Sequence, residues 1–181
     1  MIPISAVVAV TPSWGIGKSG SLPWGNILPG DMAYFRKVTK STIDKAKKNA
    51  VIMGRKTWLG IPEKNRPLGG RVNVVLTSDT DWADKNLPNG VYTAKTLQEA
   101  MALLENEPQL TGNIETAMVV GGVQLFEESI LHQNCDTYHL TKIDTEFDSD
   151  TILTPKTVEI INSLTPIEIS KQHDENGISY R

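Results

Sequence analysis

The chain has 181 residues, of which 39% are hydrophobic and 22% charged, and its formal net charge is −3. This length fits one globular domain with its own core, and the weak negative charge favours neither nucleic-acid binding nor disorder. A single cysteine excludes an intramolecular disulfide, and the three histidines lack metal-ligand spacing, so we expect no metal site. The apolar stretch at 2–10 is too short and interrupted for a signal peptide or membrane span. We therefore expect a cytoplasmic protein without nucleic-acid or membrane partners.

Short apolar runs rich in β-branched residues alternate with helical patterns along the chain. The runs 4–10, 50–53, 72–76 and 116–120 predict strands buried on both faces. Helical patterns cover 31–39, 97–104 behind a capping box at 96–99, and 123–131. Near the end, 138–143 and 167–173 predict strands, and Asn176-Gly177 predicts a hairpin turn into 178–181. The sequence predicts one α/β domain, residues 1–181, with a mostly parallel central sheet, an antiparallel C-terminal edge strand and flanking helices.

Sheets of this kind bind ligands where strands end and loops enter helices. The first such junction, Gly15 to Gly20, matches a glycine-rich dinucleotide-binding pattern, but the Leu22-Pro23-Trp24 that follows cannot begin a helix. We interpret it as a flexible loop over a ligand, with an ordinary surface loop as the alternative. Gly121-Gly122 leads directly from a strand into a helix, where backbone N–H groups suit a phosphate; a tight turn that binds nothing explains it equally well.

Two further junctions carry cations and hydroxyl groups. Arg55 and Lys56 begin a short helix, an end that disfavours cations, so an anionic ligand explains them better than structure alone. Thr77 and Ser78 add hydroxyl groups after the next strand. Three junctions compatible with phosphate are more specific than any one of them.

Asp31 heads a helix and shares a face with Phe35 and Val38. We expect this face to turn inward, where a carboxylate needs a partner such as the paired N–H groups of an amidine-like ring edge. A plain carboxylate at a helix N-terminus is the alternative. Arg71, at the mouth of a strand after Gly69-Gly70, suits bidentate binding of a carboxylate or is a solvated surface arginine.

Together these residues resemble dihydrofolate reductase, in family order and across nearly the whole chain. The stretches that carry the resemblance are 7–10, 15–18 with Leu22-Pro23-Trp24, Asp31 with Tyr34-Phe35, 51–58 (VIMGRKTW), Ile61-Pro62, Asn65-Arg66-Pro67-Leu68, Arg71, Gly121-Gly122 and 147–151.

The resemblance implies a folate site built around Asp31. This residue would bind the 2-amino group and N3 of the pterin and assist protonation at N5, through water near Trp24, with Thr141 behind it and Leu22 lining the same site. Arg71 would bind the α-carboxylate of the glutamate tail. The substrate-binding residues implied are Val7, Val8, Met32, Phe35, Ile61, Leu68, Arg71 and Val120.

The resemblance also implies NADPH as the cofactor. Its nicotinamide would lie beside Ala9, Ile16, Gly17 and Lys18. Its adenosine ribose and 2′-phosphate would be bound by Gly54, Arg55, Lys56, Thr57, Thr77, Ser78 and Lys95. Its pyrophosphate would be covered by Gly121, Gly122, Val123, Gln124 and Leu125, with Phe126 where a tyrosine is frequent. The family pattern further implies cis peptide bonds at Gly121–Gly122 and Arg66–Pro67, and a mobile cover at 15–20.

The implied activity is reduction of 7,8-dihydrofolate to 5,6,7,8-tetrahydrofolate, in support of thymidylate and one-carbon metabolism. The implied partners are dihydrofolate and antifolate inhibitors, and we expect a monomer. Phe126 bears on the rate and Met32 on inhibitor preference. The last strand should extend beyond Arg181, which predicts either a shortened chain or one domain of a larger protein, fusion to thymidylate synthase included.

Two other functions fit part of the pattern. A pyrimidine- or riboflavin-pathway reductase of related fold would share the NADPH junctions but should lack the pair Trp24 and Asp31. A non-catalytic nucleotide-binding module would keep Gly121-Gly122 and have no reason for an inward Asp31.

Overall fold

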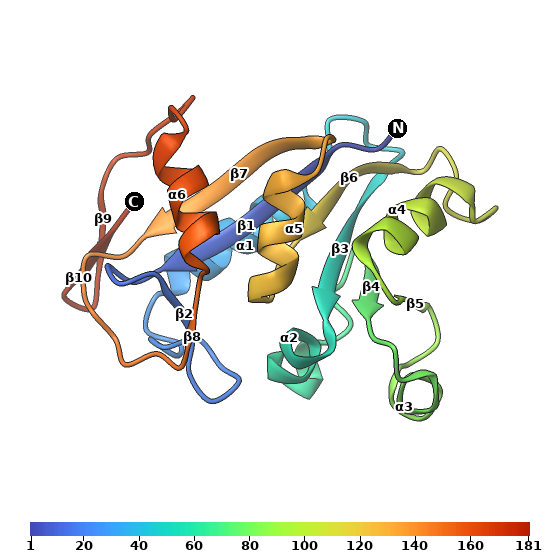
Figure 1. Ribbon diagram of the computed structural model, residues 1–181, viewed down its shortest axis with the longest axis horizontal. Helices are drawn as coiled ribbons and strands as arrows, with labels where there is room; N and C mark the ends of the chain where they lie inside the picture. The colour runs from blue at the N-terminus through green and yellow to red at the C-terminus, as the bar shows by residue number, and fades with distance from the viewer.

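A six-stranded sheet of order β5-β4-β3-β6-β1-β7 forms the centre of the computed structural model, which describes residues 1–181 (Figure 1). All of its strand pairs are parallel, as predicted for most of the sheet. The predicted apolar runs supply four of the strands, because β-branched side chains fill both of their faces. The bounds are β1 (Ile4–Val10), β3 (Lys48–Gly54), β4 (Val72–Leu76), β5 (Val91–Ala94), β6 (Ile114–Val119) and β7 (Cys135–Lys142).

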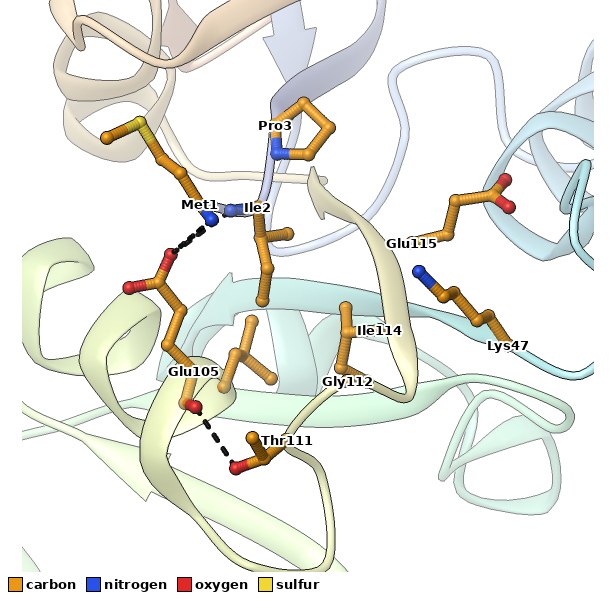
Figure 2. Close-up of a pocket in the computed structure, with 10 residues that line it drawn as sticks. Met1, Ile2, Pro3, Lys47, Glu105, Thr111, Gly112, Ile114 and Glu115 are labelled. Atoms are coloured by element: carbon orange, nitrogen blue, oxygen red, sulfur yellow. Dashed lines mark hydrogen bonds and ion pairs between the residues drawn. The ribbon is translucent and has the colours of Figure 1, made fainter.

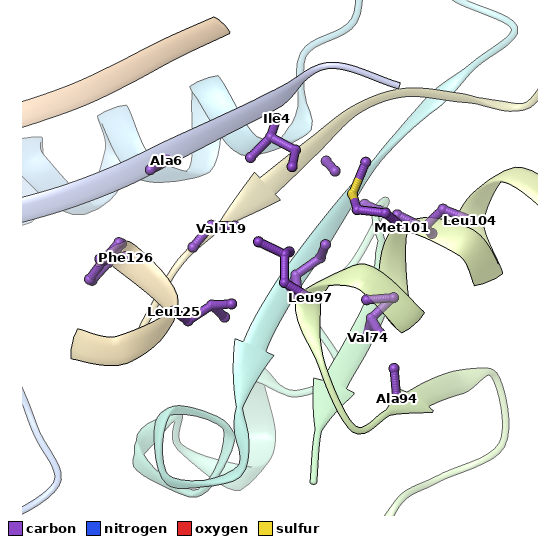
Figure 3. Packing of buried hydrophobic residues seen from close by; sticks show 14 of the residues in the cluster. Ile4, Ala6, Val74, Ala94, Leu97, Met101, Leu104, Val119, Leu125 and Phe126 are labelled. Atoms are coloured by element: carbon purple, nitrogen blue, oxygen red, sulfur yellow. The ribbon is translucent and has the colours of Figure 1, made fainter. Parts of the chain in front are cut away.

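Helices cover both faces of this sheet (Figure 1). On one face, α4 (Leu97–Asn106), α5 (Val123–Leu131) and α6 (Pro155–Ser163) pack over the larger hydrophobic cluster, shown in Figure 3. On the other, α1 (Pro29–Lys40), α2 (Arg55–Gly60) and α3 (Thr80–Asn86) pack over a smaller cluster. A short 3₁₀ helix, η1, spans Glu63–Asn65. We call the second face the α1 face.

The helices predicted from the sequence are confirmed, and so is the N-cap half of the capping box. The Glu99 side chain accepts from the Lys95 N–H at 2.8 Å and not from that of Thr96. The Thr96 hydroxyl accepts a hydrogen bond from the Glu99 N–H at 3.1 Å. Behind this cap, one side of α4 buries Leu97, Met101 and Leu104 in the larger cluster. The apolar spacing alone therefore set which side of α4 meets the sheet.

Two small antiparallel pairs accompany the sheet. β2 (Gly15–Gly17) pairs with β8 (Thr151–Ile152), and β9 (His173–Glu175) pairs with β10 (Ile178–Tyr180). The predicted turn joins β9 to β10, with φ of 52° at Asn176 and 77° at Gly177, as such a tight hairpin requires. Backbone hydrogen bonds between Lys142 and Arg181 attach β10 beside the end of β7. The antiparallel C-terminal edge is therefore confirmed.

The strand predicted at 167–173 is wrong. Residues 164–172 have no regular secondary structure, and β9 begins only at His173. The alternation that suggested a strand comes from Ile167 and Ile169, which are 94% and 66% exposed. Alternation produces a strand only where a neighbouring strand and a buried face are available, and this segment has neither.

Two backbone features expected from the family pattern are present. The peptide bonds Gly121–Gly122 and Arg66–Pro67 are both cis. No helix follows the glycines of 15–20, which enter β2 instead, so the dinucleotide-binding pattern there was a false match. Among the helices, none is both long and apolar enough to cross a membrane.

Candidate active site

The predicted junctions lie along one edge of the sheet. β4, β3, β6 and β1 are consecutive neighbours and run parallel, so their carboxyl ends at Leu76, Gly54, Val119 and Val10 come out together. The segments after β3, β4 and β6 lead into the amino ends of α2, α3 and α5, and the one after β1 leads into β2. The fold thus gathers segments from very different parts of the chain at one edge.

Glycines bring two of these junctions into contact. The Gly54 N–H donates to the Gly121 carbonyl at 2.9 Å, which joins the β3–α2 and β6–α5 turns. Gly121 has φ of 129°, and a Cβ there would lie 3.1 Å from Thr57 Oγ1. Both α2 and α5 have glycine as N-cap and no capping side chain. In α5 the Phe126 N–H already bonds to the Gly122 carbonyl, which leaves the N–H groups of 123–125 for an anion.

The conformation at Gly121 predicts a sharp difference between neighbouring substitutions. Gly121→Ala should lower the free energy of unfolding by about 1–3 kcal/mol, because its φ disfavours any side chain and its Cβ would crowd Thr57. Gly122→Ala is the control, since its Cβ would meet only Thr57 Oγ1, at 3.8 Å. Chemical denaturation of both variants measures the difference. Equal losses would show that the φ of Gly121 is not the cause.

The cations and hydroxyl groups predicted for the 2′-phosphate lie at the ends of β3, β4 and β5. Arg55 Nη1 donates to Asp79 Oδ2 at 3.0 Å, and its guanidinium lies over the Trp82 ring at 5.2 Å. The Thr77 N–H bonds to the Ala94 carbonyl, which places Lys95 beside Thr77. Ser78, Lys56 and Lys95 are exposed, and none of the three is in an ion pair. Among the side chains of Arg55, Lys56 and Lys95, only that of Arg55 therefore already has a carboxylate partner.

Asp31 is buried, as the sequence predicted. It lies in the first turn of α1 and is 8% exposed, and its hydrogen-bond partner Thr141 is also buried. Trp24 is buried too, and packs against Leu28. Burial raises the pKa of Asp31 above its ordinary value of 3.8, a hydrogen bond with Thr141 lowers it, and the charge of Glu175 raises it. The proposed catalytic carboxylate is therefore held in surroundings that favour its protonated form.

Most of the apolar residues predicted to bind substrate lie on the α1 face. Phe35, Ile61, Leu68 and Val120 are partly buried and pack against the cluster that contains Val7. Met32 and Leu22 are 41% and 36% exposed, so each has apolar surface open to solvent.

Other candidates belong to the opposite face. The side chains of Val8, Leu125 and Phe126 are buried in the larger cluster, because strand and helix periodicity turns them away from the α1 face. Only the backbone of Val8 and Leu125 is available to a ligand at the site. The Phe126 N–H is already used within α5, and its buried ring packs against Tyr138 and lies near Gly121, where a Cβ would be 3.7 Å from it. Its contact with a cofactor stays a prediction.

Arg71 lies at the other end of α1 from Asp31. Its Nη1 donates to Thr39 Oγ1 at 2.7 Å and its Nε to the Gly69 carbonyl at 3.2 Å, and it is in no ion pair. Burial and the charge of Arg36 lower the pKa of Arg71, so an anion bound here would relieve an unfavourable charge. Thr39 follows Asp31 by about 12 Å along the helix. The α1 face therefore offers a carboxylate at one end and a guanidinium at the other.

Residues 15–20 are fastened to the segment 147–152. β2 pairs with β8, Lys18 forms an ion pair with Asp148 at 2.8 Å, and the Ser19 N–H donates to Asp150 at 2.7 Å. A Cβ on Gly60 would lie 2.2 Å from the Gly20 carbonyl, so the tip of the loop also rests against the end of α2. These contacts place Ile16, Gly17 and Lys18 beyond the end of β1. Mobility of this loop stays a prediction.

Comparison with known proteins decides the family. Residues 3–180 match the family model described as dihydrofolate reductase. The chain belongs to the dihydrofolate reductase family. It is similar to the dihydrofolate reductase of Rattus norvegicus, with 38% identity over 99% of this chain and 94% of the relative. The solved structure of Schistosoma mansoni dihydrofolate reductase is 31% identical, with a TM-score of 0.81, and covers 99% of this chain and 95% of that one.

Some family relatives are much longer than this chain. A bifunctional dihydrofolate reductase-thymidylate synthase of Arabidopsis thaliana is 46% identical over 81% of this chain and only 25% of the relative. The chain therefore spans about a quarter of the length of that bifunctional protein.

The sequence did not indicate a role for Glu175, although the charge of Glu175 acts on Asp31. Its side chain accepts hydrogen bonds from the Gly30 N–H, 145 residues away in sequence. No motif around Glu175 indicates this contact, since only the return of the C-terminal hairpin to α1 creates it.

One hollow of this dihydrofolate reductase fold lies away from these residues. It has a volume of about 520 Å³ and lies at the amino ends of β1 and β6, lined by Ile2, Lys47, Glu105 and Glu115 among others (Figure 2). Glu105 is already bonded there to the Ile2 N–H at 3.1 Å. None of the candidate site residues lines this hollow, so we do not assign the site to it.

Proposed function

We propose that the protein reduces 7,8-dihydrofolate to 5,6,7,8-tetrahydrofolate with NADPH as the hydride donor. The observation that carries the proposal is the buried carboxylate of Asp31 in the first turn of α1, within hydrogen-bonding reach of Thr141. Membership of the dihydrofolate reductase family supports it. A pyrimidine- or riboflavin-pathway reductase would not need this carboxylate.

Substrate recognition would use both ends of α1. Asp31 accepts hydrogen bonds from the 2-amino group and N3 of the pterin, a pairing that satisfies a carboxylate kept away from water. Phe35, Ile61 and Leu68 cover the ring system, with Val7 beneath it and Met32, Leu22 and Val120 at its margins. Arg71 binds the α-carboxylate of the glutamate tail, and this contact offsets the repulsion between Arg71 and Arg36.

The residues at the sheet edge fit NADPH. The free N–H groups of α5 and the space left by Gly121 suit the pyrophosphate. Arg55, Thr77, Ser78 and Lys95, with Lys56 and Thr57 nearby, suit the adenosine ribose and its 2′-phosphate. Ala9 and residues 16–18 lie where the nicotinamide is expected. When bound, NADPH supplies a hydride from nicotinamide C4 to pterin C6.

The chain's own part in the chemistry is to position the reactants and manage one proton. Asp31 supports protonation at pterin N5 through water near Trp24, and the raised pKa of Asp31 keeps that proton available closer to neutral pH. Thr141 orients the carboxylate through its hydroxyl group. Residues 15–20 exclude water from the reacting atoms when they lie over the site.

A spectrophotometric assay tests the proposal. The purified protein should oxidise NADPH only when dihydrofolate is added, and methotrexate-type antifolates should inhibit the reaction. Pyrimidine- and riboflavin-pathway substrates serve as matched controls and should give no oxidation. NADPH binding without turnover on any of these substrates would favour a nucleotide-binding module and would contradict the proposal.

The protein's wider context forms part of the same proposal. We expect the reductase unit to act as a monomer on small molecules, with dihydrofolate and antifolates as its partners. The sequence of the intact gene decides whether a thymidylate synthase unit accompanies it, as in the bifunctional relatives.

A further inference from the structure

The C-terminal hairpin fastens the start of α1. Glu175 accepts the Gly30 N–H through both carboxylate oxygens, at 3.1 and 2.9 Å. Tyr180 donates its hydroxyl to Glu175 at 3.0 Å, and Asn176 donates to the Ile27 carbonyl at 2.7 Å. The N-cap residue of α1, Leu28, makes no side-chain cap. Glu175 therefore does from the far end of the chain what an N-cap side chain does locally.

The sequence at the helix start is fitted to this contact. A Cβ on Gly30 would lie 2.3 Å from the Tyr180 hydroxyl and 2.6 Å from Glu175 Oε1. Only glycine lets the carboxylate and the phenol approach the helix backbone this closely. The contact is therefore a built feature of the fold, and it lies one residue before Asp31.

We infer that Glu175 is a positioning residue for Asp31: it fixes the first turn of α1 through the Gly30 N–H and holds a second negative charge at the residue that precedes the proposed catalytic carboxylate. This inference rests on the proposed function. A nearby like charge makes the loss of a proton less favourable. The charge of Glu175 indeed raises the pKa of Asp31, after the larger effect of burial.

Three other titratable groups of this region, on Tyr34, His139 and Tyr180, stay uncharged through the neutral range, and the charge of Glu168 acts on Tyr34 but is not among the effects on Asp31. On its own helix, burial first and then the charges of Glu168 and Asp31 raise the pKa of Tyr34. From β7, His139 accepts or donates at 3.0 Å to Tyr34, and burial lowers the pKa of His139. From β10, burial and then the hydrogen bond and charge of Glu175 raise the pKa of Tyr180 to about 12. Glu175 is thus the charged group that acts on Asp31 at pH 7–9.

The test is the pH profile of Glu175→Gln with dihydrofolate and NADPH, measured as the single-turnover rate so that product release does not mask the proton step. Glutamine removes the charge and keeps one oxygen for the Gly30 N–H, and its amide nitrogen can donate to the Tyr180 hydroxyl where Glu175 accepts from it. With Asp31 more acidic, the decline in rate should begin at lower pH. The rate at alkaline pH should fall by about two- to tenfold, the effect of one like charge near a protein surface. At acid pH the rates of variant and wild type should converge.

Asp174→Asn is the matched control, because it removes the same charge from the neighbouring residue of β9, whose side chain bonds to Ser179 and Gln172 instead. Its profile should superpose on that of the wild type. Three results would overturn the inference. The Glu175→Gln profile could also superpose on that of the wild type, both variants could shift equally, or Glu175→Gln could fail to give folded protein. An inactive wild type would instead contradict the proposed function, so the two failures are distinguishable.

Discussion

Asp31→Asn should retain NADPH binding while losing most turnover at neutral pH. Asparagine is the same size but cannot hold or relay the proton for N5, and its amide presents an N–H group where the pterin needs an acceptor. Positioned acid–base groups contribute on the order of 10²–10⁴-fold, so the loss should fall in this range. Lowering the pH should restore part of the rate, since solvent protons then compensate for the missing carboxyl group.

Turnover and cofactor affinity must be measured on the same preparation to test this. Turnover is measured as the single-turnover rate at a series of pH values. Cofactor affinity is measured from the quenching of protein fluorescence by NADPH. Near-normal turnover at neutral pH would show that another group manages the proton. Loss of NADPH binding in parallel would show that Asp31 acts through the fold.

The same substitution should make the fold more stable at neutral pH. Burial raises the folded-state pKa of Asp31 above its ordinary value of 3.8, so the ionised side chain costs stability once the pH exceeds that value. Below pH 3.8 the carboxyl group is neutral in both states and the cost disappears. The melting temperature of Asp31→Asn should therefore be higher than that of the wild type at pH 7. Near pH 3 the two melting temperatures should be equal. An unchanged melting temperature at pH 7 would contradict this.

Local patterns in the sequence predicted the parts of the fold that local physics determines. Three confirmed features each depend on residues close in sequence: the β-branched runs, the Thr96 cap of α4 and the Asn176-Gly177 turn. β5 was not predicted, because its four residues range from exposed Thr93 to buried Ala94 and show no clear alternation. The strand predicted at 167–173 failed for the opposite reason, since its alternation meets no partner strand.

The candidate site also divides into residues that local sequence indicates and contacts that depend on distant segments. Asp31, Arg71 and the glycine junctions stand out in sequence because their residue types are costly or unusual where they occur. The contact of Glu175 with Gly30 and that of Arg55 with Asp79 could not be predicted, since each depends on how distant segments meet. For Val8 and Leu125, the family pattern predicted contact with a ligand but did not indicate that their side chains are buried in the larger cluster.

Arg55→Ala should weaken NADPH binding by about one to two orders of magnitude and leave NADH nearly unaffected. The two cofactors differ by the 2′-phosphate, and the planar guanidinium of Arg55 at the end of β3 suits it best. A hydrogen bond to a charged group is worth roughly 1.5–3 kcal/mol, and each 1.4 kcal/mol changes affinity tenfold. Raising the salt concentration should narrow the difference between the cofactors, because the Arg55 side chain is 41% exposed.

The bond between Arg55 and Asp79 supplies a second, opposite test of this assignment. Asp79 caps α3 through its bond to the Trp82 N–H at 2.9 Å, and asparagine caps equally well. Asp79→Asn should therefore keep the helix, remove a carboxylate that competes with the 2′-phosphate for Arg55, and tighten NADPH but not NADH. Titration calorimetry with both cofactors measures both variants. If Arg55→Ala weakens NADPH and NADH equally, Arg55 supports the fold, and Lys95 or the hydroxyl groups of Thr77 and Ser78 must bind the 2′-phosphate instead.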